Sequence, residues 1–328
     1  MSDTATLSRL FATIEPDLEI VDREFQRRAS SGLDLMNAAG AYALSSPGKR
    51  LRTALTLLSG RLFHYHFEKL LPLSVAFEMT HLATLVHDDI IDHADTRHGI
   101  PTVNARYGDS VAILLGDYLF AKTAGLIADV GDFRIDRLFS DTVATVSEGA
   151  IIELRSARHM DASIESYLER VNRKTACLIG ACCKGGATVG GASDAHIALM
   201  HEYGLNLGIA FQIVDDVLDY TGTAATIGKP AGNDIRQGLV TLPLIFALQN
   251  EHNGRLEHAQ RLFQSTAPTD EEIEAVVRWV NGTLAIDESL ALARQYAERA
   301  NALLTELHDS PDRQVLIDLT DFVLSRSH

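Results

Sequence analysis

Two clusters of aspartates share one spacing and are the residues of this sequence best suited to chemistry. The first reads Asp88-Asp89-Ile90-Ile91-Asp92, and the second reads Asp215-Asp216-Val217-Leu218-Asp219. On a helix, the first and last aspartates of each cluster lie one turn apart on the same face, where like charges repel each other. Because the flanking residues are apolar, these carboxylates are expected at the edge of a core, where they need cations nearby.

Carboxylate ligands without cysteine favour magnesium. This ion prefers oxygen ligands, keeps several waters and commonly bridges one or two carboxylates to substrate phosphates. One such cluster alone could equally be a solvated helix face or a set of helix N-caps, but that interpretation explains a repeated cluster poorly. The sequence therefore predicts two metal-binding clusters that could clamp one diphosphate between them. The predicted metal ligands are Asp88, Asp89, Asp92, Asp215, Asp216 and Asp219.

Histidines around the first cluster leave a second interpretation open. His87 directly precedes Asp88, and further histidines stand at positions 64, 66, 81 and 93. Such a group could form the metal site of an HD-type phosphohydrolase, which is also helical. That interpretation does not explain the second aspartate cluster.

A basic segment precedes the first cluster. Gly48-Lys49-Arg50-Leu51-Arg52 places three cations after a Pro-Gly turn. Lysine and arginine side chains there could bind a phosphate through charge-assisted and bidentate hydrogen bonds. The alternative is an ordinary charged helix start, because basic triplets are common on protein surfaces.

The segments between these motifs predict helices. Apolar residues recur at helical spacing, for example at positions 7, 10, 11, 14 and 18. Glycine and proline gather at 46–48, 98–101, 185–191 and 222–238, where loops or helix ends are expected. No alternation of strands and helices, flexible linker or repeat is visible. We therefore expect an all-α fold with a single domain over residues 1–328.

Composition narrows the classes of protein that fit. The chain has 328 residues, 46% of them hydrophobic, and a formal net charge of -15, which argues against binding to a nucleic-acid backbone. Its three cysteines form no CxxC pair, which favours a reducing cytoplasm over a disulfide framework. The first 16 residues lack a signal-peptide pattern. The most apolar stretch, Leu70 to Val86, is shorter than the roughly 20 residues that span a bilayer and is interrupted by Glu78 and His81, so no transmembrane segment is expected.

The order of these motifs resembles the trans-polyprenyl diphosphate synthase family. The resemblance covers residues 48–248 through GKRLR, HLATLVHDDIIDHADTRHGIPT, RKTACL, FQIVDDVLDYTG and GKPAGNDIRQGLVTLP. It implies one large helical bundle of the isoprenoid synthase type around a deep central cavity. It also implies a magnesium-dependent prenyltransferase, with three Mg²⁺ ions, that joins an allylic diphosphate to isopentenyl diphosphate. The diphosphate that leaves would take the final proton.

The resemblance assigns roles by position. Lys49, Arg52 and His81 match residues that grip the diphosphate of isopentenyl diphosphate, and His98 stands where the family usually has a further arginine for this group. Arg97, Lys174, Thr175, Gln212 and Lys229 match contacts on the allylic side. Lys174 and Lys229 would also stabilise the leaving diphosphate, together with the aspartate-bound ions.

Three positions depart from the family pattern. His98 replaces an arginine, so that contact becomes shorter and dependent on pH. Leu239 stands where a lysine is often found. The segment from Gly149 to Glu153 lacks the usual glutamate and glutamine of a GExxQ pattern.

Product length and assembly are the remaining expectations. Ala83 and Thr84 lie about one helical turn before Asp88 and are small, whereas short-chain members of the family tend to have an aromatic residue there. We therefore expect hexaprenyl to decaprenyl products, with a farnesyl or geranylgeranyl diphosphate synthase as the alternative. A homodimer is expected, or else the catalytic subunit of a heteromer with a small regulatory partner. A terpene cyclase is disfavoured, because two basic segments indicate two diphosphate substrates.

Overall fold

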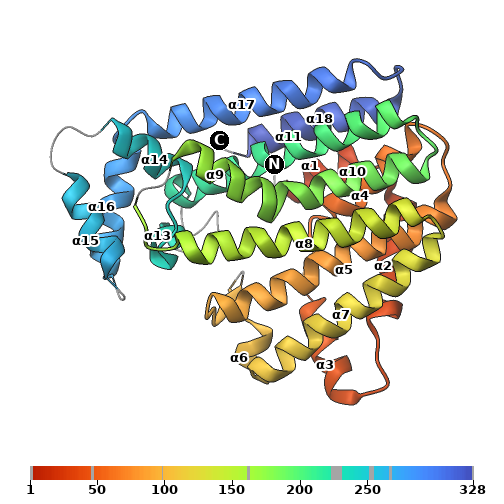
Figure 1. The fold of residues 1–328 in the computed structure, drawn as a ribbon, viewed down its shortest axis with the longest axis horizontal. Helices are drawn as coiled ribbons and strands as arrows, with labels where there is room; N and C mark the ends of the chain where they lie inside the picture. Colours follow the sequence, from red (N-terminus) through yellow and green to blue (C-terminus); the bar gives the residue numbers. More distant parts are fainter. Residues whose placement is uncertain are drawn as a thin grey trace. The chain divides into compact units, whose positions relative to one another are not determined.

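The computed structural model of the chain is helical throughout most of its length (Figure 1). It describes residues 3–45, 48–97, 99–160, 163–222, 231–250, 255–265 and 268–326. The longest helices are α5 (Phe67–Ile91), α7 (Asp109–Val130), α8 (Phe133–Ser156) and α11 (Asp194–Thr221). Two short strands, β1 (Thr96–Arg97) and β2 (Ile100–Pro101), form an antiparallel hairpin. The predicted all-α fold is confirmed.

Contacts within the chain divide it into two compact units. The first comprises Met1–Val143, Leu178–Gly204 and Leu303–Leu319, and the second comprises Ala144–Cys177, Leu205–Ala302 and Thr320–His328. The boundaries fall inside α8, α10 (Cys177–Val189), α11, α17 (Ala285–Leu304) and α18 (Pro311–Ser325), so neither unit is one continuous stretch of sequence. The single domain over residues 1–328 stays a prediction.

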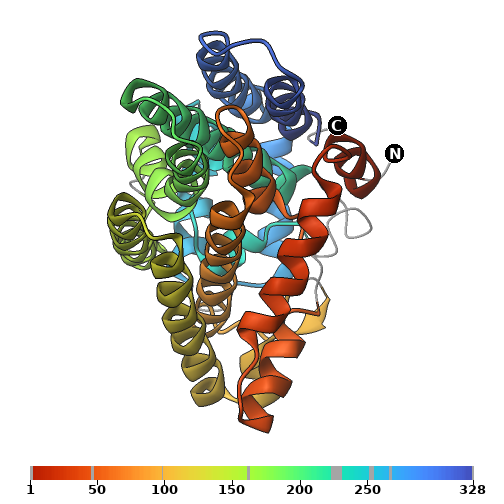
Figure 2. The same cartoon turned by 90° about the vertical axis from the view of Figure 1, so that its right-hand side faces the viewer.

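In the first unit, α5 packs along α7, and the two form its main helix pair (Figure 1). Helix α4 (Leu51–Arg61) packs on α5, whereas α2 (Glu15–Ala29) contacts both members of the pair. Figure 2 shows α2, in red, from the side. The short α6 (Val103–Tyr107) joins α5 to α7 beyond the β1–β2 hairpin. The remaining elements of this unit include α1 (Asp3–Leu10), α3 (Asp34–Ala43) and most of α10 (Cys177–Val189).

The glycines at 185 and 186 lie inside α10, so the loop or helix end predicted for this pair is wrong. A Cβ atom at Gly186 would lie 2.2 Å from the Thr56 carbonyl oxygen and 2.9 Å from the Ser59 Cβ. The glycine therefore permits close contact between α10 and α4. The predicted helix end is correct further on, where Gly191 adopts a positive φ of 71°.

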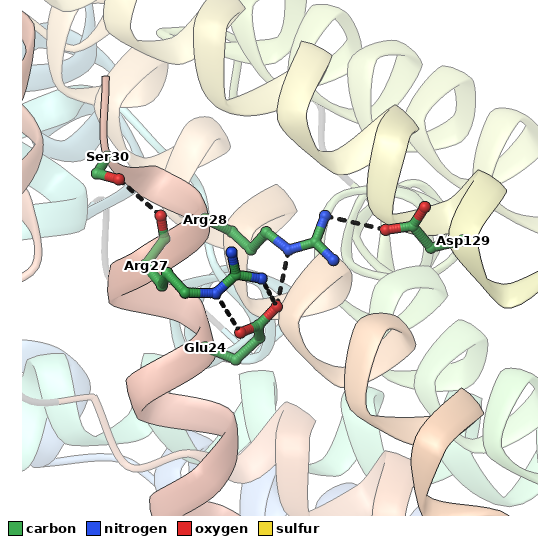
Figure 3. Close-up of polar contacts among 5 residues, drawn as sticks. All are labelled: Glu24, Arg27, Arg28, Ser30 and Asp129. Atoms are coloured by element: carbon green, nitrogen blue, oxygen red, sulfur yellow. Dashed lines mark hydrogen bonds and ion pairs between the residues drawn. The ribbon is translucent and has the colours of Figure 1, made fainter. Parts of the chain in front are cut away.

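An ion-pair network links α2 to α7 (Figure 3). Glu24 accepts hydrogen bonds from Arg27 Nε and Arg28 Nε, both at 2.7 Å, and Arg28 Nη1 lies 2.9 Å from Asp129 Oδ2. The Glu24 side chain is 18% exposed, and hydrogen bonds from these arginines lower its pKa to about 2. The network therefore stabilises the contact between the two helices while Glu24 is ionised.

Replacing Glu24 with glutamine should destabilise the protein in a pH-dependent way. The folded-state pKa lies below the unfolded value, so the stabilisation is present above about pH 4.5 and is lost as the pH falls toward about 2. Because the arginines are partly exposed, the loss at pH 7 should be on the order of 1 kcal/mol or less. Thermal denaturation of Glu24→Gln and wild type between pH 7 and pH 3 should show a difference that shrinks with acid.

Glu19 provides the matched control on the same helix. It lies 3.9 Å from Arg23, and both side chains are more than 60% exposed. Glu19→Gln should therefore leave the melting temperature nearly unchanged. Equal effects of the two substitutions would contradict the role of the α2–α7 network.

The second unit contains the later parts of α8, α11 and α18 and several further elements. These are α9 (Ile164–Val171), the π-helical turn η1 (Asn172–Ala176), α13 (Asn233–Gln237), α14 (Leu242–Gln249), α15 (Arg255–Gln264), α16 (Asp270–Asn281) and most of α17 (Ala285–Leu304). Tyr167, Tyr220, Phe263 and Trp279 are buried in its core. Helix α16 lies beside α15 and begins with a capping box, in which Thr269 and Glu272 satisfy each other's backbone amides (Figure 1).

Among the residues that the structure describes, three helices are long and apolar enough to cross a membrane, judged by length and composition alone: α5, α7 and α11. The length argument made for Leu70 to Val86 is therefore wrong, because α5 extends over 25 residues. In α5 and α11, 61% of the apolar window is buried inside the protein, as expected for core helices, whereas in α7 the share is 39%. The expected lack of a transmembrane segment stays a prediction.

Candidate functional site

The first aspartate cluster lies at the C-terminal end of α5. Asp89 is only 5% exposed; its Oδ1 accepts a hydrogen bond from Arg97 Nε at 2.9 Å and forms an ion pair with Arg97 Nη2 at 2.8 Å. Asp88 is half-buried, and Asp92, the C-cap of α5, is exposed. The cluster thus contains one carboxylate that holds an arginine and two that are more accessible.

The β1–β2 hairpin positions Arg97. Arg97 pairs with Ile100 across the hairpin, and Gly99 takes a positive φ of 79° at its turn. The Ala94 amide donates to the Asp89 carbonyl at 2.9 Å, and Thr102 Oγ1 donates to the Ala94 carbonyl at 2.7 Å. These bonds tie the hairpin to the end of α5, so the predicted allylic-side arginine lies next to the first cluster.

His81 lies with two predicted phosphate-binding arginines in the first unit. Burial, and then the charges of Arg52 and Arg97, hold the pKa of His81 well below its usual range. His81 is therefore neutral at pH 7 before a ligand binds. Within the part of the chain that the structure describes, Arg52 Nε is buried without a hydrogen-bond partner. A buried, unpartnered guanidinium nitrogen points to an anionic ligand at this place.

Some residues at the start of α4 make structural contacts, and others belong to the predicted phosphate-binding site. Arg50, at φ 52°, forms an ion pair with Asp22 of α2. On the next turn, Thr53 donates from both its amide and its Oγ1 to Glu78 Oε1 of α5, each at 3.1 Å. These contacts fix the start of α4, which carries Arg52. Lys49 is exposed just before the helix.

Two of the histidines near the first cluster have structural positions in the first unit. His87 faces α7, with its Nε2 3.1 Å from the Ile113 carbonyl oxygen, and a Cβ at Gly116 would lie 2.1 Å from the same nitrogen. His66 is the N-cap of α5. Among the described residues, no group of three or more His, Cys, Asp or Glu side chains is close enough to hold a metal by itself.

The predicted chain-length residues lie on α5 as expected for one turn before Asp88. Ala83 is fully buried, and Thr84 is half-buried with its Oγ1 donating to the His81 carbonyl at 2.8 Å. Their role in product length stays a prediction.

The second cluster lies near the C-terminal end of α11, and Asp216 is its buried member. Asp216 accepts hydrogen bonds from the Tyr167 hydroxyl at 2.6 Å and from Gln212 Nε2 at 2.7 Å. Thr175 Oγ1 in turn donates to Gln212 Oε1 at 2.9 Å. Burial, and to a smaller extent the charge of Asp215, raises the pKa of Asp216 to about 7, against the opposing effect of these hydrogen bonds. The predicted residues Thr175, Gln212 and Asp216 thus form one chain of contacts.

Asp219 holds the backbone that precedes and begins α13. Its Oδ1 and Oδ2 accept from the amides of Asn233 at 3.1 Å and Asp234 at 3.0 Å. Burial, followed by the charges of Asp219, Asp216 and Glu153, raises the pKa of Asp234 well above its usual range. This concentration of carboxylates is an environment that a cation would stabilise.

Lys174 belongs to the π-helical turn η1 and forms an ion pair with Glu153 of α8. A Cβ at Gly149, one turn earlier on α8, would lie 2.6 Å from the Lys174 amide nitrogen. Gly149 therefore allows α8 to approach the turn, and Glu153 holds the lysine side chain. Although this segment lacks the glutamate and glutamine of GExxQ, its two end residues have clear structural roles here.

Asp215, the third member of the second cluster, is 34% exposed and lies next to the C-terminal end of the chain. Arg326 Nη1 is 2.9 Å from its Oδ1. The amide of Leu239, the position where a lysine is often found, donates to the Asp234 carbonyl at 2.8 Å. His98 and Lys229, both predicted for the site, lie outside the described residues.

Among the described residues, four that contact the predicted site were not predicted from the sequence: Glu153, Tyr167, Asp234 and Arg326. Asp234 follows the second cluster in the quoted GKPAGNDIRQGLVTLP segment and could have been found there. Tyr167 and Arg326 stand in no motif, so only the fold reveals them. The clamp of one diphosphate by both clusters stays a prediction, because each cluster belongs to a different unit.

Comparison with known proteins identifies the family of the chain. The family model for polyprenyl synthetases matches residues 33–280. Heptaprenyl diphosphate synthase component 2 of Geobacillus stearothermophilus is 35% identical over 324 residues, which cover 98% of this chain and 99% of that protein. A crystal structure of a Caulobacter crescentus polyprenyl synthase, complexed with calcium and isoprenyl diphosphate, superposes with a TM-score of 0.94 at 32% identity and 98% coverage of both chains.

A decaprenyl diphosphate synthase from Rhodobacter capsulatus superposes with a TM-score of 0.92 at 32% identity, covering 98% of this chain and 99% of its own. The helical fold, the order of the motifs and the length of these matches agree. The chain therefore belongs to the polyprenyl synthetase family.

Proposed function

We propose that this chain is a trans-prenyltransferase that joins an allylic diphosphate to isopentenyl diphosphate, repeatedly, to give a hexaprenyl to decaprenyl diphosphate. The observation that carries the proposal is the set of basic groups beside the first aspartate cluster. Arg97 is held by Asp89, and Arg52 offers a buried nitrogen without a partner among the described residues. Such a set suits a diphosphate better than any neutral substrate.

We assign magnesium to the carboxylates of both clusters, Asp88, Asp89, Asp92, Asp215, Asp216 and Asp219, which offer hard oxygen ligands. Asp89 and Asp216 are buried, and the other four are at least partly exposed. The calcium in the Caulobacter structure supports divalent metal use. The chemistry that such ions supply is Lewis-acid stabilisation of the leaving diphosphate. The family resemblance supports three of them with substrate bound.

The chain's own residues bind and orient the two substrates. On the allylic side, Arg97 and Lys174 stabilise the charge that develops as the carbon–oxygen bond breaks, with Lys229 as a further cation. Arg52, His81 and Lys49 hold isopentenyl diphosphate so that its double bond faces the allylic carbon, and this orientation supplies part of the rate. Neutral His81 takes up a proton more readily once a diphosphate lies beside it. Water must be excluded from the site, since it would capture the allylic cation that forms when the carbon–oxygen bond breaks.

Release of inorganic diphosphate distinguishes this function from its alternatives. The purified chain with Mg²⁺ should release it only when farnesyl diphosphate and isopentenyl diphosphate are both present, one per isopentenyl unit consumed. Release from the allylic substrate alone would indicate a cyclase, and inorganic phosphate would indicate a phosphohydrolase. Omission of Mg²⁺ in the presence of EDTA should abolish the reaction.

Replacing Ala83 with phenylalanine should shorten the product. Ala83 is fully buried on α5, one turn before the first cluster, so a large ring there should block the growing chain. Chromatography of the dephosphorylated products should show fewer isoprene units than wild type. Overpacking could cost about 1–3 kcal/mol, so the melting temperature is measured in parallel. Ala83→Ser is the small-residue control; identical product lengths for all three proteins would place the length limit elsewhere.

We propose a homodimer as the assembly, or a heteromer in which this chain is the catalytic subunit. The exposed apolar residues Ile113 and Leu114 on α7, 45% and 58% exposed, support a subunit contact. The name of the Geobacillus relative, component 2, supports the heteromer. The three cysteines of this chain, which form no CxxC pair, lead us to propose the cytoplasm as its location.

A further inference from the structure

The last described residue, Arg326, contacts the second aspartate cluster. Helix α18 ends at Ser325, and Arg326 then lies against α11 with its Nη1 2.9 Å from Asp215 Oδ1. Its guanidinium carbon is 5.0 Å from the centre of the Phe211 ring, one turn before Asp215 on α11. All three residues belong to the second unit. The contact joins the C-terminal end of the chain to the predicted metal site.

This ion pair is well protected from solvent. The Arg326 side chain is only 12% exposed, so salt screens its attraction to Asp215 less than that of a surface pair. The guanidinium keeps its charge at any physiological pH, and an aromatic ring below it stabilises that charge further. Asp215 thus has a permanent cation beside it in the absence of any ligand.

The other two aspartates of the cluster are held differently. Asp216 accepts from Tyr167 and Gln212 inside the core, and Asp219 accepts from the backbone at the start of α13. Those partners lie within elements of the fold and are uncharged, whereas the Arg326 guanidinium carries a permanent charge. Asp215 is therefore the carboxylate at which a metal ion would meet a cation of the protein.

We propose that Arg326 is the resident counterion of Asp215 and that a divalent metal ion binds the second cluster by displacing it. The inference rests on the proposed function, which assigns a metal to Asp215. A divalent ion and a guanidinium on the same carboxylate repel each other, because neither charge can be lost. Arg326 therefore weakens metal binding and keeps Asp215 neutralised until the metal arrives, which makes it a positioning residue.

Binding of Mn²⁺ alone to the full chain tests this directly. Free Mn²⁺ is measured by electron paramagnetic resonance, without substrate and without turnover. Arg326→Gln should bind Mn²⁺ roughly tenfold more tightly than wild type, and Arg326→Lys should lie between them. Arg313→Gln is the matched control, since Arg313 lies on α18, the helix that precedes Arg326, and donates to the Leu307 carbonyl at 3.0 Å. It removes the same net charge and should leave the affinity unchanged.

Two further measurements separate the possible failures. Asp215→Asn should abolish the tighter binding site; if Mn²⁺ binding is independent of Asp215 in every variant, the metal assignment of the proposed function fails. If binding depends on Asp215 but Arg326→Gln is no tighter than wild type, only the displacement by Arg326 is overturned. A lower melting temperature of Arg326→Gln with unchanged Mn²⁺ affinity would likewise show a purely structural contact. If Arg326→Gln does not fold, the Mn²⁺ affinity of Arg326→Lys is compared with that of wild type instead.

Discussion

Replacing Asp88 with alanine is expected to lower kcat by about two to three orders of magnitude while leaving the fold intact. Asp88 is half-buried near the end of α5. Its loss removes one predicted metal ligand and therefore part of the stabilisation of the leaving diphosphate. Steady-state incorporation of labelled isopentenyl diphosphate measures the effect, with thermal denaturation as the check on folding.

Asp95 provides the control for this substitution. It is exposed, lies three residues beyond the cluster, and contributes only its carbonyl, which accepts from the Thr102 amide at 3.0 Å. Asp95→Ala should therefore retain nearly all activity. An Asp88→Ala variant that is as active as Asp95→Ala would remove the first cluster from the mechanism.

Replacing Gly149 with alanine is expected to reduce both stability and activity. The new Cβ would lie 2.6 Å from the Lys174 amide nitrogen and 2.8 Å from the Arg173 carbonyl carbon, so the backbone of η1 must move. Such overpacking costs about 1–3 kcal/mol, and each kcal/mol lowers the melting temperature by roughly 2–4 °C in a large domain. Because η1 carries Lys174, the KM for the allylic diphosphate should also rise.

Gly125 on α7 is the matched glycine. Nothing lies within 4 Å of a Cβ built there, so Gly125→Ala should be neutral or should stabilise the helix by up to about 1 kcal/mol. Calorimetry and steady-state kinetics of the two variants make the comparison. If Gly149→Ala matches Gly125→Ala in both measurements, the close contact between α8 and η1 is needed neither for stability nor for activity.

The sequence allowed the helices and the main motifs to be predicted, because both depend on local spacing. Asp88 and Asp92 fall one turn apart at the end of α5, and Thr175, Gln212 and Asp216 form connected hydrogen bonds as their motif positions suggest. The resemblance also predicted the family correctly. These features need only the periodicity of a helix and the order of the motifs.

Features that depend on contacts between distant segments could not be predicted. Gly186 reads as a helix breaker, yet it lies inside α10 because α4 approaches too closely for any side chain. Glu153 reads as a departure from a motif, yet it pairs with Lys174. Arg326 lies more than a hundred residues beyond Asp215, and no sequence signal connects them.

Incubation of the purified chain alone with farnesyl diphosphate, labelled isopentenyl diphosphate and Mg²⁺, followed by chain-length analysis of the dephosphorylated products, tests the central claim most directly. We expect products of six to ten isoprene units, because Ala83 and Thr84 are small. Products that stop at farnesyl or geranylgeranyl length would contradict the predicted length class. No incorporation by the chain alone, restored by a second subunit, would support the heteromer, and no incorporation under either condition would contradict the proposed reaction.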